Sequence, residues 1–155
     1  MNILYIIISA LPFLISLPYS LLNKNKFNIN EKKALWQPPG YVFGIVWPIL
    51  YLFILKFNYI LLTKDNFFII SSHILTDSFI QGAWLYVFQS NNDSRGNIQY
   101  IKGLLLLILL NIFAWYRLYY SYIIQPSIAV YYIPYVLWIM FALVLNYQLY
   151  YGITK

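Results

Sequence analysis

The chain alternates between long apolar stretches and short polar connections. An α-helix needs about 20 mostly apolar residues to cross a bilayer, and five stretches reach roughly that length. Because lipid offers no partner to a backbone N–H or C=O group, such segments must be helical. The pattern predicts an all-α integral membrane protein with a five transmembrane helix bundle, in one domain over residues 1–155. The predicted helices cover residues 2–22, 41–62, 67–88, 101–122 and 128–151, with kinks expected at Pro12, Pro18 and Pro134.

Composition supports this prediction and excludes several other classes of protein. Hydrophobic residues make up 62% of the chain and charged residues 9%, whereas soluble domains carry about 25% charged residues. The absence of cysteine excludes disulfides and cysteine-ligated centres. One histidine and four acidic residues leave too few ligands for a metal cage. We therefore predict no metal site.

The net charge of +6 is explained by orientation in a membrane, because the basic residues lie at the ends of the predicted helices. We expect no nucleic acid partner. In a five-helix chain the first connection, the third connection and the C-terminus share one side, and this side is the more basic. The positive-inside rule places it in the cytoplasm and the N-terminus outside. The basic residues on this side are Lys24, Lys26, Lys32, Lys33, Arg95, Lys102 and Lys155.

The second predicted helix begins with a series of aromatic residues. A Pro-Pro-Gly sequence that ends at Gly40 predicts the helix start, because proline lacks a backbone N–H and glycine permits a sharp turn. Phe43, Trp47 and Tyr51 follow at intervals of four, on one helix face. They form either a flat wall for a planar or sterol-like ligand or part of an interfacial aromatic belt. Trp36 fits the belt, whereas the deeper position of Trp47 favours a ligand wall.

A stripe on the third predicted helix is a second candidate site. Three polar groups are followed by two aromatic rings at intervals of three or four residues, namely His73, Asp77, Gln81, Trp84 and Phe88. An acidic side chain inside a membrane is costly unless it is paired, solvated or neutral, which makes it a functional candidate.

Structural roles explain parts of the same helix. Asp77 is either a functional acid or a structural group that is protonated inside the bundle or paired with Arg117. A lone histidine near a helix end, such as His73, more often has a structural role. Ser78 and Gly82 form a small-residue pair that permits close helix approach, either within the chain or at a dimer seam.

The fifth predicted helix carries a third cluster. Trp138 offers a ring face and an indole N–H, and Ala142 leaves space beside it on the same stripe. Helix packing through a small residue explains this spacing equally well. Asn146 lies one turn further and is expected to hydrogen-bond across helices. A loose sterol-binding pattern, which chance also produces in a tyrosine-rich chain, follows at Leu149, Tyr150, Tyr151 and Lys155.

These motifs resemble those of the translocator protein family, also called tryptophan-rich sensory proteins or peripheral-type benzodiazepine receptors. The family pattern W-x-P-P-x-x-x-F-x-x-V-W-x-x-L-Y is matched at Trp36, Pro38, Pro39, Phe43, Val46, Trp47, Leu50 and Tyr51. The pattern P-Y-x-x-W-x-x-F-A-x-x-L-N is matched at Pro134, Tyr135, Trp138, Phe141, Ala142, Leu145 and Asn146. The third helix departs from the family, because Gln81 stands where Asn is usual and Asp77 stands at a position that is usually uncharged.

The resemblance implies a five-helix bundle, usually a homodimer, with a pocket near the first connection that accepts porphyrins, sterols and isoquinoline- or benzodiazepine-type drugs. No cofactor is required, and porphyrin or haem is a ligand. The expected pocket walls are Trp47, Gln81, Trp84, Trp138 and Ala142, with further ligand contacts from Phe27, Pro39, Phe43, Tyr51, Phe88 and Asn146. Some relatives are reported to break down protoporphyrin in light through tryptophans that match Trp47 and Trp138, the candidate catalytic residues.

We therefore expect a membrane receptor or translocator that binds protoporphyrin IX, haem or sterol-like molecules in tetrapyrrole or lipid transport or in stress signalling. Indole rings stack on a planar macrocycle and an amide meets its polar edge. The lysines of the first connection either meet its propionates or serve topology alone. Two alternatives stay open: a porphyrin-degrading enzyme that depends on light or oxygen, and a proton-linked transporter that uses His73, Asp77 and Arg117. The membrane is the mitochondrial outer membrane in a eukaryote and a cell-envelope membrane in a bacterium.

Overall fold

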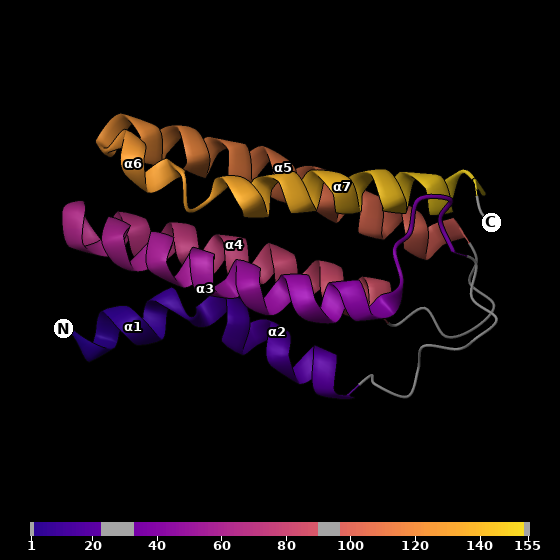
Figure 1. Cartoon of the computed structure of the whole chain (residues 1–155), viewed down its shortest axis with the longest axis horizontal. Coiled ribbons are helices and arrows are strands. Elements are labelled where there is room, and N and C mark those ends of the chain that lie inside the picture. Colours follow the sequence, from indigo (N-terminus) through magenta and orange to yellow (C-terminus); the bar gives the residue numbers. More distant parts are fainter. Residues whose placement is uncertain (1, 23–32, 90–96, 154–155) are drawn as a thin grey trace.

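The computed structural model describes residues 2–22, 33–89 and 97–153, and the regular elements in these ranges are helices. They are α1 (Ile3–Ser9), α2 (Leu11–Leu22), α3 (Gly40–Lys64), α4 (Phe67–Gln89), α5 (Asn97–Ile124), α6 (Pro126–Ala129) and α7 (Ile133–Tyr150). The helices run along the long axis of an elongated bundle, and α1 begins at the end opposite to the end of α7 (Figure 1). The helix α5 packs against both α4 and α7, while α2 packs against α4.

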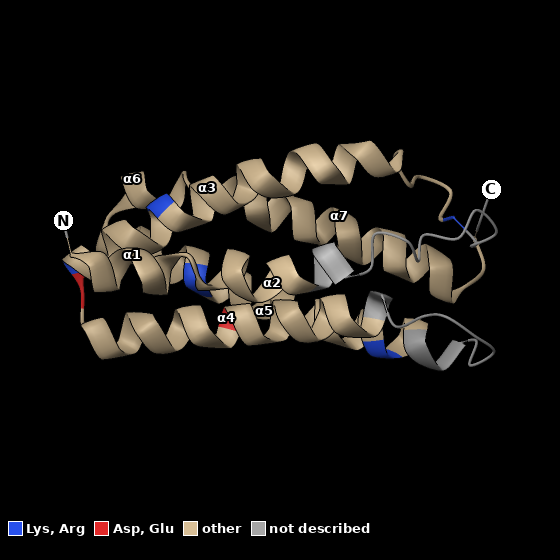
Figure 2. Cartoon of the chain, turned by 90° about the horizontal axis from the view of Figure 1, so that it is seen from below, with Lys and Arg blue, Asp and Glu red and all other residues tan. Residues whose placement is uncertain are grey.

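Three of the described helices are long and apolar enough to cross a bilayer. They comprise Gly40–Lys64, Tyr100–Ile124 and Ile133–Tyr150. Charged residues are sparse along the helices (Figure 2). This confirms the prediction of an all-helical membrane protein.

The first and fifth predicted helices are each interrupted. The first divides into α1 and α2 at Ala10, whose N–H still bonds to the carbonyl groups of Ile6 and Ile7 at 3.0 and 3.2 Å. Pro12 follows at once and has no N–H to continue the hydrogen-bond ladder, whereas Pro18 lies inside α2. The prolines thus predicted an irregular first helix but not the position of its break.

At the other end of the chain, the predicted helix over residues 128–151 is two helices. The short α6 starts with proline at its first turn, and Pro134 occupies the first turn of α7. Proline is well suited to that position, because the N–H groups of a first turn have no partner within the helix. The kink expected at Pro134 is therefore a helix start.

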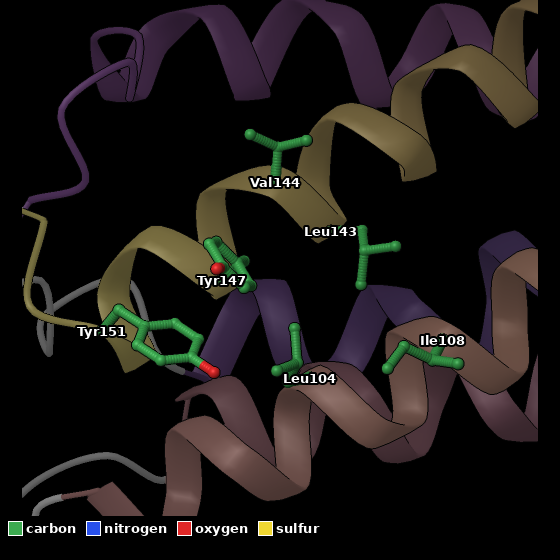
Figure 3. A pocket seen from close by; sticks show the side chains of 6 residues that line it. All are labelled: Leu104, Ile108, Leu143, Val144, Tyr147 and Tyr151. Atoms are coloured by element: carbon green, nitrogen blue, oxygen red, sulfur yellow. The ribbon is translucent and has the colours of Figure 1, made fainter.

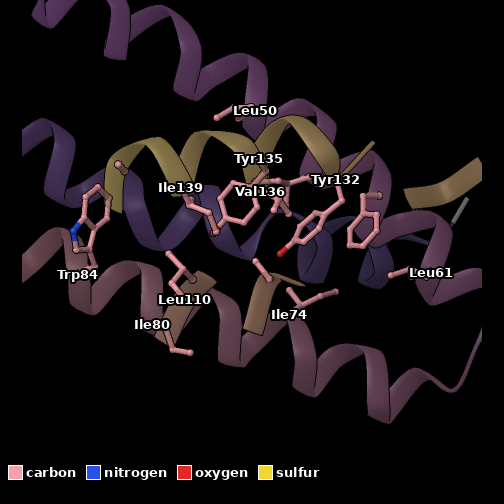
Figure 4. Packing of buried hydrophobic residues seen from close by; sticks show 14 of the residues in the cluster. Leu50, Leu61, Ile74, Ile80, Trp84, Leu110, Tyr132, Tyr135, Val136 and Ile139 are labelled. Atoms are coloured by element: carbon pink, nitrogen blue, oxygen red, sulfur yellow. The ribbon is translucent and has the colours of Figure 1, made fainter. Parts of the chain in front are cut away.

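The interior combines aliphatic residues with aromatic rings that carry hydroxyl groups. Tyr132 and Tyr135 extend from α7 into the buried cluster (Figure 4), and both are 0% exposed. The ring of Phe57 on α3 stacks on Tyr132 with 4.2 Å between centroids. Two phenol groups thus lie deep in the bundle, where each hydroxyl needs a polar partner.

Candidate functional site

The predicted aromatic face of α3 is present and continues onto α2. The helix starts at Gly40 after an extended Pro39 at the N-cap, as the Pro-Pro-Gly sequence predicted. The rings of Trp47 and Tyr51 stack with 5.5 Å between centroids. Phe13 of α2 meets Tyr51 edge-on at 5.5 Å.

Indole rings from three helices lie around the first half of α3. Trp84 of α4 lies 6.3 Å from Trp47 between ring centroids. Trp138 of α7 meets Phe43 edge-on at 5.6 Å and lies against Phe141 on its own helix, also at 5.6 Å. We call these residues (Phe43, Trp47, Tyr51, Trp84 and Trp138) the aromatic site.

Two buried polar atoms on α7 have no hydrogen-bond partner among the described residues. They are the indole nitrogen of Trp138 and the side-chain oxygen of Asn146. The amide nitrogen of Asn146 donates to the carbonyl of Ala142 at 3.3 Å, within its own helix and not across helices as expected. A Cβ on Gly103 of α5 would meet the side-chain oxygen of Asn146 at 3.0 Å. One stripe of α7 therefore has an unsatisfied donor and an unsatisfied acceptor next to the aromatic rings.

Gln81 lies in the interior and is bound on both sides. Its amide nitrogen donates to the hydroxyl of Tyr51 at 2.8 Å and to that of Ser16 at 3.4 Å. Its side-chain oxygen accepts from Tyr135 at 3.4 Å. The Gln81 amide, which was expected to contact a ligand, therefore holds the hydroxyl of Tyr51 in this structure.

The segment that leads into α3 is fastened to the end of α7. The backbone N–H of Trp36 donates to the side-chain oxygen of Gln148 at 3.2 Å, and the N–H of Leu35 donates to the carbonyl of Ile153 at 3.2 Å. Ala34 is 0% exposed and packs with Leu145 and Leu149, while Phe43 borders the same cluster. This segment, residues 34–37, adjoins the aromatic site at Phe43 and is called the strap below.

Asp77 is paired with Arg117, which was one of its predicted structural roles. The two side chains are 0% and 1% exposed, and 2.6 Å separates Nη1 of Arg117 from Oδ2 of Asp77. His73 has a different environment: it is half-buried, and its ring meets Tyr120 and Tyr116 of α5 edge-on at 5.2 and 5.4 Å. No group of three or more metal-ligating side chains occurs in the described part of the chain.

The structure also shows the environment of the small-residue pair, of Pro39 and of Trp36. Ser78 and Gly82 are buried within the chain, and a Cβ on Gly82 would meet Ile15 of α2 at 2.8 Å. Gly82 therefore packs α4 against α2, which favours the interpretation of the pair as a contact within the chain. Pro39 is exposed at the helix start, and Trp36 is 63% exposed, as a belt residue would be.

The expected contacts of Phe27 and of the Phe88 side chain lie outside the described residues, as do Lys24, Lys26, Lys32, Arg95 and Lys155.

An apolar groove lies between α5 and α7 (Figure 3), and its lining includes no tryptophan. It has a volume of about 420 Å³. Tyr151, from the loose sterol pattern, contributes to it. The full lining is Leu104, Ile108, Leu143, Val144, Tyr147 and Tyr151.

Sequence reasoning missed the polar residues that organise the interior. Asn58 of α3 accepts a hydrogen bond from Arg117 at 2.6 Å and donates to the carbonyl of Ser9 at 3.2 Å. Its signal was a single amide in an apolar run, seven residues after Tyr51 and hence on the same helix face. Tyr132 gave no such signal, because it lies in a chain with 17 tyrosines.

Comparison with known families agrees with this geometry. The model of the TspO/MBR family matches residues 8–151, nearly the whole chain. No curated protein sequence gives a significant match. The family match confirms the resemblance that the tryptophan motifs indicated and makes the protein a membrane protein of the translocator and receptor kind. The chain therefore belongs to the TspO/MBR family.

Proposed function

We propose that this protein binds a flat tetrapyrrole, such as protoporphyrin IX or haem, at the aromatic site and moves or presents it within the membrane. The observation that carries the proposal is the convergence of Trp47, Trp84 and Trp138 from three helices. Indole faces stack on planar conjugated rings through dispersion and quadrupole interactions. Ligand sites in proteins are mostly apolar with a few placed polar groups, and this site has that composition.

The unsatisfied atoms on α7 supply the polar groups. The N–H of Trp138 is a donor only, so it suits a carbonyl or carboxylate oxygen of the ligand. The side-chain oxygen of Asn146 is an acceptor and suits an N–H or O–H group. Eight residues of helix separate these groups by about 12 Å along the axis, at about 1.5 Å per residue. A ligand several rings across is long enough to use both.

An exposed cation lies at the start of the strap, which packs near Phe43 of the aromatic site. Lys33 precedes the strap and is exposed. Propionate groups of a porphyrin would meet this ammonium group at the membrane surface, while the macrocycle lies among the indoles. Charge and aromatic area are thus arranged in the order that an amphipathic tetrapyrrole requires.

Titration of protoporphyrin IX against the purified protein in lipid nanodiscs tests the proposal. Because tryptophan emission changes in tryptophan variants, binding is followed by the absorbance of the porphyrin. We expect Trp47→Leu and Trp138→Leu to weaken binding about tenfold, the equivalent of about 1.4 kcal/mol. Trp115→Leu is the matched control, because Trp115 is 49% exposed on α5. Equal affinity in all three variants would contradict the proposed site.

The membrane arrangement is part of the proposal. Besides the three helices long and apolar enough to span, α4 and the pair α1–α2 each run along the bundle (Figure 1), which gives five crossings. The strap side is then cytoplasmic and the N-terminus is outside. A cysteine introduced at Thr63, which is exposed in the last turn of α3, should react with an impermeant maleimide only from the outside. If Thr63→Cys reacts only from the cytoplasmic side, the orientation of the protein is the opposite of the one proposed.

The groove between α5 and α7 supports a second ligand class, sterol-like molecules. Its walls are apolar and the Tyr151 hydroxyl can bond to a sterol hydroxyl. We expect Leu143→Trp to fill the groove and to reduce labelling by a photoreactive sterol. Leu137→Trp, on the exposed face of the same helix, is the control. If Leu143→Trp leaves the labelling unchanged, the sterol does not bind in this groove.

A further inference from the structure

We propose that the buried ion pair of Arg117 and Asp77 is a positioning element for the aromatic site, a proposal that rests on the function proposed above. The pair itself does not touch the tryptophans. Its effect passes through tyrosine hydroxyls to Gln81, and from Gln81 to Tyr51 and Trp47. Each step in this path is a contact between described side chains.

Arg117 connects four helices. From α5 its Nη1 donates to Asp77 of α4 at 2.6 Å and to the hydroxyl of Tyr132 on α7 at 3.3 Å. Its Nη2 donates to Asn58 of α3 at 2.6 Å. The planar guanidinium fixes the directions of these bonds, which a lysine ammonium would not. One side chain therefore sets how α3, α4 and α7 lie around α5.

Stability alone is a poor reason for this arrangement. Removing two charges from water costs about as much as their attraction returns, and apolar residues of the same volume often stabilise a protein equally well or better. Buried ion pairs are better suited to specifying one geometry. The pair in this protein is fully buried, and the geometry that it specifies extends to the aromatic site.

The path to the aromatic site begins at Asp77. The hydroxyl of Tyr132 donates to Oδ2 of Asp77 at 2.9 Å, and the ring of Tyr135 lies 5.1 Å from that of Tyr132. Both rings enter the core from α7 (Figure 4). The two rings thus lie against each other, and the hydroxyl of Tyr135 donates to the side-chain oxygen of Gln81 at 3.4 Å. A shift of the ion pair therefore moves the hydroxyl against which Gln81 is oriented.

The path ends at the stacked rings. The amide of Gln81 has a donor side and an acceptor side, and rotation by half a turn exchanges them. With Tyr135 on the acceptor side, the donor side faces Tyr51, whose ring stacks on Trp47. The orientation of Gln81 thus fixes the position of the Tyr51 ring and, with it, one wall of the aromatic site.

The test uses protein labelled with ¹⁵N-glutamine in nanodiscs, and the side-chain amide signal of Gln81 is assigned by its loss in Gln81→Leu. The double variant Asp77→Asn with Arg117→Gln removes both charges without leaving one unpaired. We expect its Gln81 signal to move and its affinity for protoporphyrin IX to fall about tenfold, as for the loss of about one hydrogen bond. Lys56→Met removes an exposed cation from α3 and is the control.

A second variant decides the matter if the double variant does not fold. Tyr132→Phe removes the hydroxyl between the ion pair and α7, and the adjacent Tyr131→Phe is its matched control. A shifted Gln81 signal in Tyr132→Phe, but not in Tyr131→Phe, supports the proposal. An unchanged Gln81 signal in either folded variant of the network overturns it, even where the unfolding temperature falls. Because the signal is recorded without ligand, failure of the native protein to bind porphyrin would contradict the proposed function separately.

Discussion

The backbone N–H of Trp36 donates to the side chain of Gln148, 112 residues away in the sequence. The last turn of α7 therefore holds the segment that introduces α3. The tryptophan side chain itself is largely exposed, so the contact depends on the backbone and not on the ring. Together with the bond from Leu35 to Ile153, this contact holds the strap against the end of α7.

Substitution of Gln148 by leucine should loosen the strap. Leucine has a similar size but cannot accept the hydrogen bond, and we expect a loss of about 1 kcal/mol in the free energy of unfolding. Hydrogen exchange at the Trp36 amide should become faster, whereas the amides of α5 should not change. Gln125→Leu is the control, because the side chain of Gln125 donates to the nearby Ser127, which lies two residues away. Unchanged exchange at Trp36 in Gln148→Leu would contradict the role given to this bond and would show that the bond from Leu35 to Ile153 is sufficient to hold the strap.

Gly82 distinguishes packing within the chain from dimer formation. A larger side chain at this position must displace Ile15, because a Cβ alone would lie 2.8 Å from it. We expect Gly82→Leu to lower the free energy of unfolding by about 1–3 kcal/mol, the usual cost of overpacking. Thermal unfolding in detergent measures this change. Gly44→Leu is the control, since no atom lies within 4 Å of a Cβ on Gly44.

A different result for Gly82→Leu would restore the dimer interpretation. In that case the variant would leave the unfolding temperature unchanged and would reduce the dimer fraction measured by light scattering. The buried position of Gly82 argues for the first outcome.

Neutralising one member of the ion pair should be far more harmful than neutralising both. Asp77→Asn leaves the Arg117 cation buried without its counterion, and we expect a loss of about 3–5 kcal/mol. Addition of Arg117→Gln should restore most of it. Asp65→Asn, at the end of α3, is the control for the loss of an acidic group and should have a small effect. If the double variant is no more stable than Asp77→Asn, the two charges do not act as a pair.

The connection between α3 and α4 should respond to acid. The hydroxyl of Tyr120 and the N–H of Asn66 donate to Asp65, and these bonds lower the pKa of Asp65 below its ordinary value of 3.8. A lowered pKa means that Asp65 contributes stability above pH 4 or so, and that this contribution is lost as the pH falls through the folded-state pKa. Unfolding temperatures measured between pH 3 and pH 6 should show a smaller acid-induced decrease in Tyr120→Phe. An equal decrease in Tyr120→Phe and in the neighbouring Tyr119→Phe would contradict this assignment.

Local pattern was sufficient to predict most helices and one face of the site. The length of the apolar runs determines where helices form in lipid, and Pro-Pro-Gly marks the start at Gly40. The four-residue interval between Trp47 and Tyr51 is enough to place them on one helix face, and their stacking confirms this prediction. That five helices cross the membrane, and that these rings bind a ligand, stay predictions.

Long-range packing explains what the sequence did not predict. The approach of Trp84 to Trp47 depends on how α4 rotates against α3, and no local pattern encodes that rotation. The partners of Gln81 come from α2, α3 and α7. The spacing of residues on α4 therefore could not predict that its amide is already hydrogen-bonded within the chain. The strap joins residues at opposite ends of the sequence, beyond the reach of any window.

The position of Arg117 also constrains how the chain is made. Asn58 and Asp77 precede it in the sequence, whereas Tyr132 follows. During synthesis from the N-terminus, the acid and the amide are therefore already in place when α5 emerges with its cation. An arginine inside a membrane helix costs up to about 2.5–3.5 kcal/mol during insertion, and the amide and the acid of the earlier helices are available to offset this cost. A circularly permuted chain in which α5 came first would have to insert the same arginine alone.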